Sequence, residues 1–191
     1  MSTKPNFTLR QVIEQLDSGY YWDTDSLTFG FATGVPAGGF PSSERWGLSS
    51  FSEEQKQATL VAMSLWDELI PIDLSLGSSS SADILLINYT LSGQAYSYLP
   101  TDGDIFINPQ SPSNFQLDFG EYGFTTLIHE IGHALGLDHP GQYDAAYDFD
   151  LNYANHAEYQ QDSLQYSVMS YWEESLTGAD HAFQEPSSPL L

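Results

Sequence analysis

Three stretches of the chain repeat apolar residues at the 3.6-residue spacing that places them on one face of a helix. They run from about Thr8 to Asp17, from Ser52 to a stop at Pro71, and from about Gly123 to Leu135. At the start of the first two, a Thr or Ser is followed three residues later by Gln, which predicts a capping box. Gly136 follows the third stretch, and glycine suits the left-handed conformation at the end of a helix. The pattern therefore predicts three helices.

Five shorter stretches have the composition of strands and are bounded by turn-forming residues. They are Leu27–Phe31, Ile72–Leu76, Asp83–Tyr89, Gln94–Tyr98 and Asp104–Asn108. After Gly136 no period is strong, and the segment is rich in Tyr and Asp. We find no internal repeat and read the chain as one domain: a small α/β part over about residues 1–136, followed by an irregular part over 137–191.

The charge of the chain excludes several classes of partner. Four basic residues against 26 acidic ones give a formal charge of −22, and every Lys and Arg lies at or before Lys56. Binding of nucleic acids or of an anionic membrane surface requires cations, so we expect neither. No apolar run reaches the length of a membrane span, and the N-terminus has no basic region followed by an apolar stretch, so no signal peptide is expected.

The predicted third helix carries the pattern H-E-x-x-H-x-x-G-x-x-H. Residues i and i+4 lie on one helix face, so His129 and His133 can direct two imidazoles at one metal ion. Glu130 lies beside the first imidazole, where its carboxylate can reach a water without displacing a ligand. Gly136 allows a chain reversal that returns His139 as a third ligand. Three nitrogen ligands with one open position are typical of a catalytic zinc site.

A lone histidine is more often part of the core or the surface than a ligand. Five fixed positions coincide by chance with a probability on the order of 10⁻⁵ in a chain of this composition, which favours the metal site. Three Asp-x-Asp pairs could suggest Ca²⁺ as well, but they lack the spacing of a binding loop and favour turns or solvated surface. These pairs are Asp23–Asp25, Asp102–Asp104 and Asp148–Asp150.

The eleven-residue pattern resembles that of the metzincin metalloproteases, and the residues around it resemble the serralysin branch. The matching segments, in family order, are Phe51–Gln55, Ala82–Ile84, Gly93–Tyr96, Pro140–Tyr143 and Gln165–Trp172. The resemblance implies a zincin-like α/β (α+β) catalytic domain. Its twisted, mostly parallel sheet of about five strands would have an antiparallel edge strand, two long helices and an irregular C-terminal subdomain.

The resemblance also implies roles for residues outside the helix. Met169 would be the Met-turn residue beneath the histidines, and Tyr171 an additional zinc ligand that stabilises the tetrahedral intermediate. An extended substrate would pair with the edge strand formed by Gln94, Ala95, Tyr96, Ser97 and Tyr98. Hydrolysis would use a zinc-activated water with Glu130 as general base. Pairing through the backbone predicts broad endopeptidase specificity.

The family resemblance also implies partners and a location for the protein. We expect protein or peptide substrates, a proteinaceous inhibitor as a further partner, a monomer, and a secreted protein. The calcium-binding repeat domain that carries the family's export signal has no counterpart in these 191 residues.

Two kinds of alternative compete with the zinc endopeptidase. A non-catalytic protein could use an inert metzincin fold to bind a peptide or partner, but retention of Glu130 argues against it. Among enzymes, an astacin-like protease is disfavoured because the chain has no Cys. A matrixin-like protease is disfavoured because a Tyr follows Met169 in a Met-x-Tyr arrangement.

Overall fold

The computed structural model describes residues 4–33, 47–90, 93–145 and 150–177. Residues 148 and 149 of the Asp148–Asp150 pair lie outside the described residues. Two compact units divide the chain: one is Leu16–Asp138, and the other joins the N-terminal segment through Gln15 to the chain from His139 onward. The single domain with two subdomains that divide after about residue 136 stays a prediction. None of the helices in the described ranges combines the length and apolar character that crossing a membrane requires.

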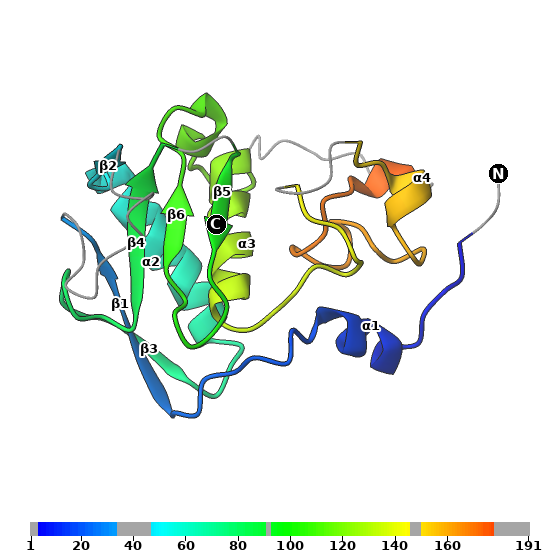
Figure 1. Ribbon diagram of the computed structural model, residues 1–191, viewed down its shortest axis with the longest axis horizontal. Helices are drawn as coiled ribbons and strands as arrows, with labels where there is room; N and C mark the ends of the chain where they lie inside the picture. The colour runs from blue at the N-terminus through cyan, green and yellow to red at the C-terminus, as the bar shows by residue number, and fades with distance from the viewer. Residues whose placement is uncertain (1–3, 34–46, 91–92, 146–149, 178–191) are drawn as a thin grey trace, which may run out of the picture. The chain divides into compact units, whose positions relative to one another are not determined.

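The unit Leu16–Asp138 is built from one sheet and two long helices (Figure 1). Its elements are β1 (Ser26–Phe31), β2 (Leu48–Ser49), α2 (Glu53–Asp67), β3 (Asp73–Leu76), β4 (Ile84–Tyr89), β5 (Ala95–Ser97), β6 (Ile105–Ile107), the 3-10 helix η2 (Pro112–Phe115) and α3 (Tyr122–Ala134). The predicted strands and the second and third predicted helices are confirmed to within a few residues at their ends. The two-residue β2 was not predicted.

The sheet has the strand order β3-β1-β4-β6-β5, with β2 pairing antiparallel to one end of β4. Neighbours are parallel along this path except β5, which runs antiparallel to β6 at the edge. The predicted α/β class, with a mostly parallel sheet and an antiparallel edge strand, is confirmed.

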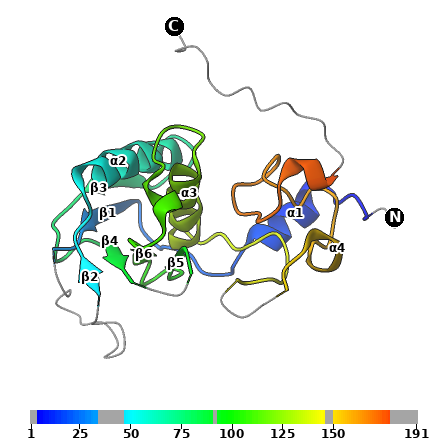
Figure 2. The same cartoon turned by 90° about the horizontal axis from the view of Figure 1, so that it is seen from above.

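Both long helices cover the same face of the sheet (Figure 2). Along β4 the side chains alternate between two cores: Ile84 and Leu86 face the helices, while Leu85 and Ile87 face the other side. On the helix side, residues of α2 and α3 complete the larger core. The opposite face is covered by aromatic rings, with Tyr96 stacked on Phe106 at 4.5 Å between ring centroids. Burial on both faces explains why β4 reads as a continuous apolar run.

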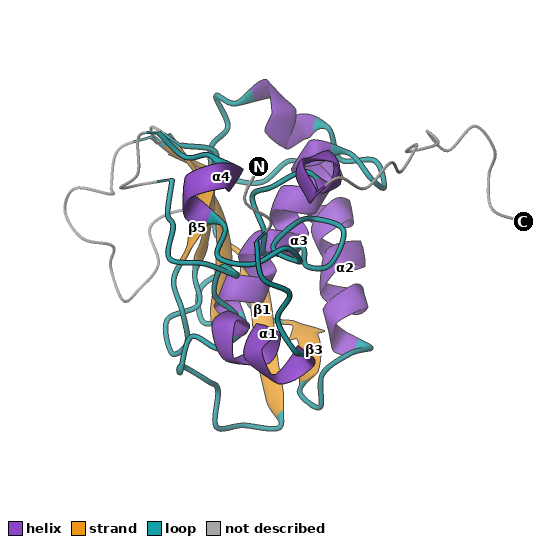
Figure 3. Ribbon diagram, turned by 90° about the vertical axis from the view of Figure 1, so that its right-hand side faces the viewer, coloured by secondary structure: helices purple, strands orange, loops and turns teal. Residues whose placement is uncertain are grey.

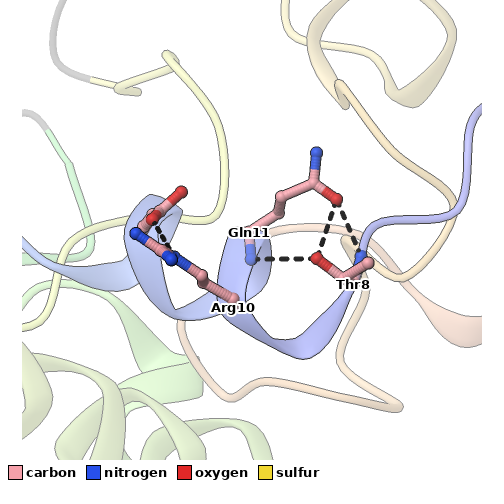
Figure 4. Close-up of polar contacts among 4 residues, drawn as sticks. Thr8, Arg10 and Gln11 are labelled. Atoms are coloured by element: carbon pink, nitrogen blue, oxygen red, sulfur yellow. Dashed lines mark hydrogen bonds and ion pairs between the residues drawn. The ribbon is translucent and has the colours of Figure 1, made fainter.

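Both predicted capping boxes are present. At the start of α2, the Ser52 hydroxyl accepts the Gln55 amide hydrogen, and the Gln55 side chain accepts the Ser52 amide hydrogen. Thr8 and Gln11 make the same reciprocal contacts at the start of α1 (Leu9–Leu16), with distances of 3.0 and 3.4 Å (Figure 4). These bonds satisfy amide groups that have no partner inside the helix, which fixes where each helix begins.

The apolar face of α1 is not buried as its period predicts. No residue of this helix is buried, and Leu9 and Ile13 are 75% and 56% exposed. The helix is capped at its start and carries an exposed ion pair between Arg10 and Glu14, 2.8 Å long and one turn apart, while Val12 and Leu16 are half-buried.

The second unit has little regular structure, in agreement with the weak periodicity after Gly136. Its regular elements within the described residues are α1, which reaches its boundary, the short α4 (Tyr153–His156) and the 3-10 helix η3 (Glu174–Thr177); Figure 3 shows α1 and α4. The N-terminal segment belongs to this unit through specific contacts: Phe7 stacks on Tyr159 with 4.4 Å between ring centroids, and the Gln160 amide donates to the Pro5 carbonyl. Ring stacking and backbone hydrogen bonds between turns therefore both hold this unit together.

One carboxyl directly before β6 makes the stability of the fold depend on pH. Burial raises the pKa of Asp104 to about 6. The hydrogen bond that its carboxylate accepts from the Leu85 amide acts in the opposite direction and lowers the pKa, but by less. The folded state thus binds this proton more tightly than the unfolded chain, where the pKa is near 4. The resulting stabilisation is complete below about pH 4 and is lost as the pH rises through 6. Two pKa units correspond to roughly 2.7 kcal/mol, which partial exposure reduces to about 1 kcal/mol.

Asp104→Asn is therefore expected to raise the free energy of unfolding by about 1 kcal/mol at pH 8 and to leave it unchanged at pH 4. Urea unfolding with a chelator present measures both values, and the exposed Asp118→Asn is the control. A gain of equal size at both pH values would contradict the assigned cause.

Candidate metal centre

Helix α3 brings two imidazoles together and carries a buried glutamate directly after the first of them. His129 and His133 lie one turn apart on the helix, and their Nε2 atoms are 3.1 Å apart. The two rings meet edge to face, with 4.8 Å between centroids. Glu130 follows the first histidine and is only 6% exposed. A buried acid thus accompanies a pair of converging ring nitrogens.

The end of α3 turns the chain at Gly136. The Leu137 amide donates to the Gly132 carbonyl and the Gly136 amide to the His133 carbonyl, both at 2.9 Å, which is the Schellman pattern. Gly136 has a φ of +110°, in the left-handed region where residues with a β-carbon are strained. This confirms the helix end predicted from the sequence.

Contacts after the turn fix the chain that leads to His139. The Asp138 amide donates to the Leu16 carbonyl at 2.8 Å, and the Ser18 hydroxyl donates to the Gly136 carbonyl at 2.6 Å. Asp17 and Leu137 form an antiparallel bridge. The last residue of α1 and the two residues after it therefore guide the path between the second and third histidines.

Two of the imidazoles are oriented through their other ring nitrogen. His133 Nδ1 lies 2.8 Å from the Leu137 carbonyl oxygen, and His139 Nδ1 lies 2.9 Å from that of Tyr143. A carbonyl can only accept, so each Nδ1 carries the hydrogen and each Nε2 keeps its lone pair for a metal. Backbone carbonyls in this position are typical outer-sphere partners of metal-bound histidine.

The donor set fits zinc. Among the described residues, one group of three or more potential metal ligands occurs, and it consists of His129, His133 and His139. Each histidine contributes one ligand atom, and these atoms all lie within 4.8 Å of one another. Nitrogens at 2.0–2.1 Å from a tetrahedral zinc ion would be about 3.3 Å apart, close to the 3.1 Å between His129 and His133. Neutral imidazole is a preferred zinc ligand.

Gly136→Ala tests the importance of the turn. A β-carbon there would lie 2.5 Å from the Tyr20 carbonyl oxygen, in addition to the strain of a positive φ. We expect a loss of at least about 2 kcal/mol in the free energy of unfolding and weaker zinc binding.

Gly120→Ala is the matched control for that substitution. Gly120 also has a positive φ (+88°), but a β-carbon there meets nothing within 4 Å. It should cost only about 1 kcal/mol and leave zinc binding unchanged. Denaturant unfolding and chelator competition measure both effects, and equal losses for the two variants would contradict the role given to the close approach.

Tyr171 and Met169 lie in the second unit together with His139. The rings of Tyr171 and His139 are in contact, edge to face, with 4.5 Å between centroids. Met169 is 1% exposed. The structure thus brings the predicted tyrosine next to the third histidine, and it buries the predicted methionine two residues earlier.

A buried acid that the sequence did not reveal lies among these residues. Asp162 is fully buried and accepts hydrogen bonds from the Tyr143 hydroxyl (2.9 Å), the Ser170 hydroxyl (2.7 Å) and the Trp172 indole (3.2 Å). Burial raises the pKa of Asp162, while the bonds from these donors lower it. Burial also raises the pKa of Tyr143, so its hydroxyl remains a donor. Asp162 belongs to no motif, and only its position in an otherwise uncharged aromatic stretch could have singled it out.

The predicted substrate strand forms the edge of the sheet alongside α3. Ala95, Tyr96 and Ser97 make up β5, flanked by Gln94 and Tyr98. The Asn108 amide donates to the Gln94 carbonyl and the Tyr98 amide to the Asp104 carbonyl, each at 2.9 Å. In an antiparallel ladder the hydrogen-bonded pairs alternate, so the backbone groups of Ala95 and Ser97 point away from β6 toward the open edge.

Comparison with known proteins relates the chain to a family of proteases. Serralysin G of Dickeya chrysanthemi is 32% identical over 97% of this chain and 43% of its own length. Metalloprotease AprA of Pseudomonas entomophila is 36% identical over 92% of this chain and 39% of its own length. A serralysin of Photorhabdus luminescens is 36% identical over 79% of this chain and 34% of its own length. The chain thus spans about two fifths or less of the length of these curated relatives. No protein-family model matches it.

Proposed function

Because the chain belongs to the serralysin family of metalloproteases, we propose that it is a zinc-dependent endopeptidase. The observation that carries the proposal is the convergence of three imidazoles beside a buried glutamate. His129, His133 and His139 would bind the zinc ion through Nε2. Three protein ligands leave a coordination position open, as catalytic rather than structural sites do.

A zinc ion in such a site acts as a Lewis acid and lowers the pKa of a bound water to about 7. Glu130 follows His129 directly, so its carboxylate can take a proton from the attacking water and return it to the leaving amine. His133 and His139 are kept in the required tautomer by the carbonyls of Leu137 and Tyr143.

Tyr171 is proposed to donate its phenolic hydrogen to the oxygen that becomes negative when the scissile carbonyl is attacked. Its ring contact with His139 supports this role, because it places the phenol next to a metal ligand. In the resting site the phenolic oxygen is a candidate additional ligand. Met169 is proposed to support the histidines from below, in line with its burial.

The substrate is proposed to be an extended stretch of protein that pairs with β5. The open backbone groups of Ala95 and Ser97 would bond to the substrate backbone, which is the same for every sequence. This predicts broad specificity. By family resemblance we also propose an extracellular enzyme, and a proteinaceous inhibitor remains a candidate partner.

Casein digestion tests the proposed activity. The protein is expected to cleave casein at neutral pH, to lose activity in a zinc chelator and to regain it when zinc is restored. The competing proposal, a non-catalytic protein that binds peptides on an inert metzincin fold, predicts casein binding without cleavage. Stable casein in the presence of zinc-loaded protein would overturn the endopeptidase.

A further inference from the structure

Asp162 connects two segments that both contact the third histidine. One segment contains Tyr143, whose carbonyl accepts the hydrogen of His139 Nδ1 and whose hydroxyl donates to Asp162 Oδ1. The ring of Tyr143 also stacks on the imidazole of His139, with 5.4 Å between centroids. The position of this carbonyl and ring relative to His139 therefore depends on where Asp162 anchors the tyrosine.

The other segment contains the residues on both sides of Tyr171. The Ser170 hydroxyl donates to Asp162 Oδ1 and the Trp172 indole donates to Oδ2. The Ser170 hydroxyl also accepts the Trp172 amide hydrogen at 3.2 Å. Asp162 thus fixes the backbone immediately before and after Tyr171.

We propose that Asp162 is a positioning residue that sets the orientation of the zinc ligand His139 and of Tyr171 through one buried carboxylate. The inference rests on the proposed zinc site. A carboxylate suits this position because it only accepts hydrogen bonds, and all three groups that face it are donors. Any neutral side chain of the same size presents a donor or an apolar group to at least one of them.

Asp162→Asn is the first test. If the amide oxygen replaces Oδ1, its NH₂ group faces the indole N–H of Trp172, and in the flipped orientation it faces the hydroxyls of Tyr143 and Ser170. Either way a buried donor loses its acceptor. Loss of outer-sphere partners typically weakens metal binding 10–100-fold, and we expect zinc affinity to fall about tenfold, measured by competition with a chromophoric chelator.

Tyr143→Phe is the second test, because it removes the hydroxyl that donates to Asp162 and keeps the ring beside His139. We expect a similar loss of zinc affinity, and less than the sum of the two losses in the double variant, since both substitutions disturb the same hydrogen-bonded group around position 162.

Two controls separate positioning from general stability. Ser163→Ala changes the neighbouring side chain, which is equally buried. Phe7→Ala removes the ring stacked on Tyr159 and destabilises the same unit. Both should bind zinc within twofold of the wild type when folded. A thermal melt establishes that each variant is folded at the assay temperature.

The outcomes distinguish this inference from the proposed function. Wild-type zinc affinity in Asp162→Asn or Tyr143→Phe would overturn the positioning role and leave the endopeptidase intact. An equal loss in Phe7→Ala would also overturn it, since the effect would then follow stability alone. Failure of the wild type to bind zinc would instead refute the proposed function on which the inference rests.

Discussion

Glu130→Ala is expected to lower kcat for casein by about 10²–10⁴-fold while zinc remains bound. The range is that lost when a general acid–base group is removed. Zinc should remain because the group of potential ligands consists of the three histidines and does not include Glu130. Steady-state kinetics and the zinc content of the dialysed protein measure the two quantities on the same sample.

Glu121→Ala is the matched control for that substitution. Glu121 is an exposed acid at the start of the same helix, and its side chain makes no capping bond. Its removal should leave kcat and zinc content unchanged. Casein turnover in Glu130→Ala at the wild-type rate would eliminate Glu130 as the base.

His133→Ala is expected to abolish both zinc retention and casein cleavage. Loss of an outer-sphere partner costs 10–100-fold in metal affinity, and loss of a direct ligand should cost considerably more. His133 also carries the interaction with the Leu137 carbonyl just beyond the Gly136 turn. Zinc content after dialysis and chelator competition measure the effect.

His156→Ala is the control for histidine removal in general. Its imidazole lies in α4 next to Asn152 and is not part of the histidine group. Zinc binding and casein cleavage should persist in this variant. Zinc bound at full stoichiometry by His133→Ala would show that the ion is bound elsewhere.

The parts of the fold that the sequence predicts are those encoded by local patterns. The helices around Ala62 and Ile131 and the strand at Ile84–Tyr89 follow from periodicity, and the capping boxes from a spacing of three residues. The turn at Gly136 could be predicted because one residue type tolerates its conformation. His129, Glu130, His133 and His139 share one motif and could be found together.

What the sequence does not predict depends on contacts between distant residues. The apolar period of α1 indicates a buried face, yet Leu9 and Ile13 are exposed, because periodicity does not show whether a partner surface exists. Asp162 meets Tyr143 from 19 positions away, and no local spacing records this pairing. β2 is too short to show any alternation.

The account stands on one zinc ion bound jointly by the three imidazoles. Diffraction from crystals of the zinc-loaded protein, recorded on both sides of the zinc absorption edge, tests this claim most directly. We predict a single anomalous peak at about 2.0–2.1 Å from the Nε2 atoms of His129, His133 and His139. A fully loaded crystal in which the peak lies away from any one of these nitrogens would contradict it.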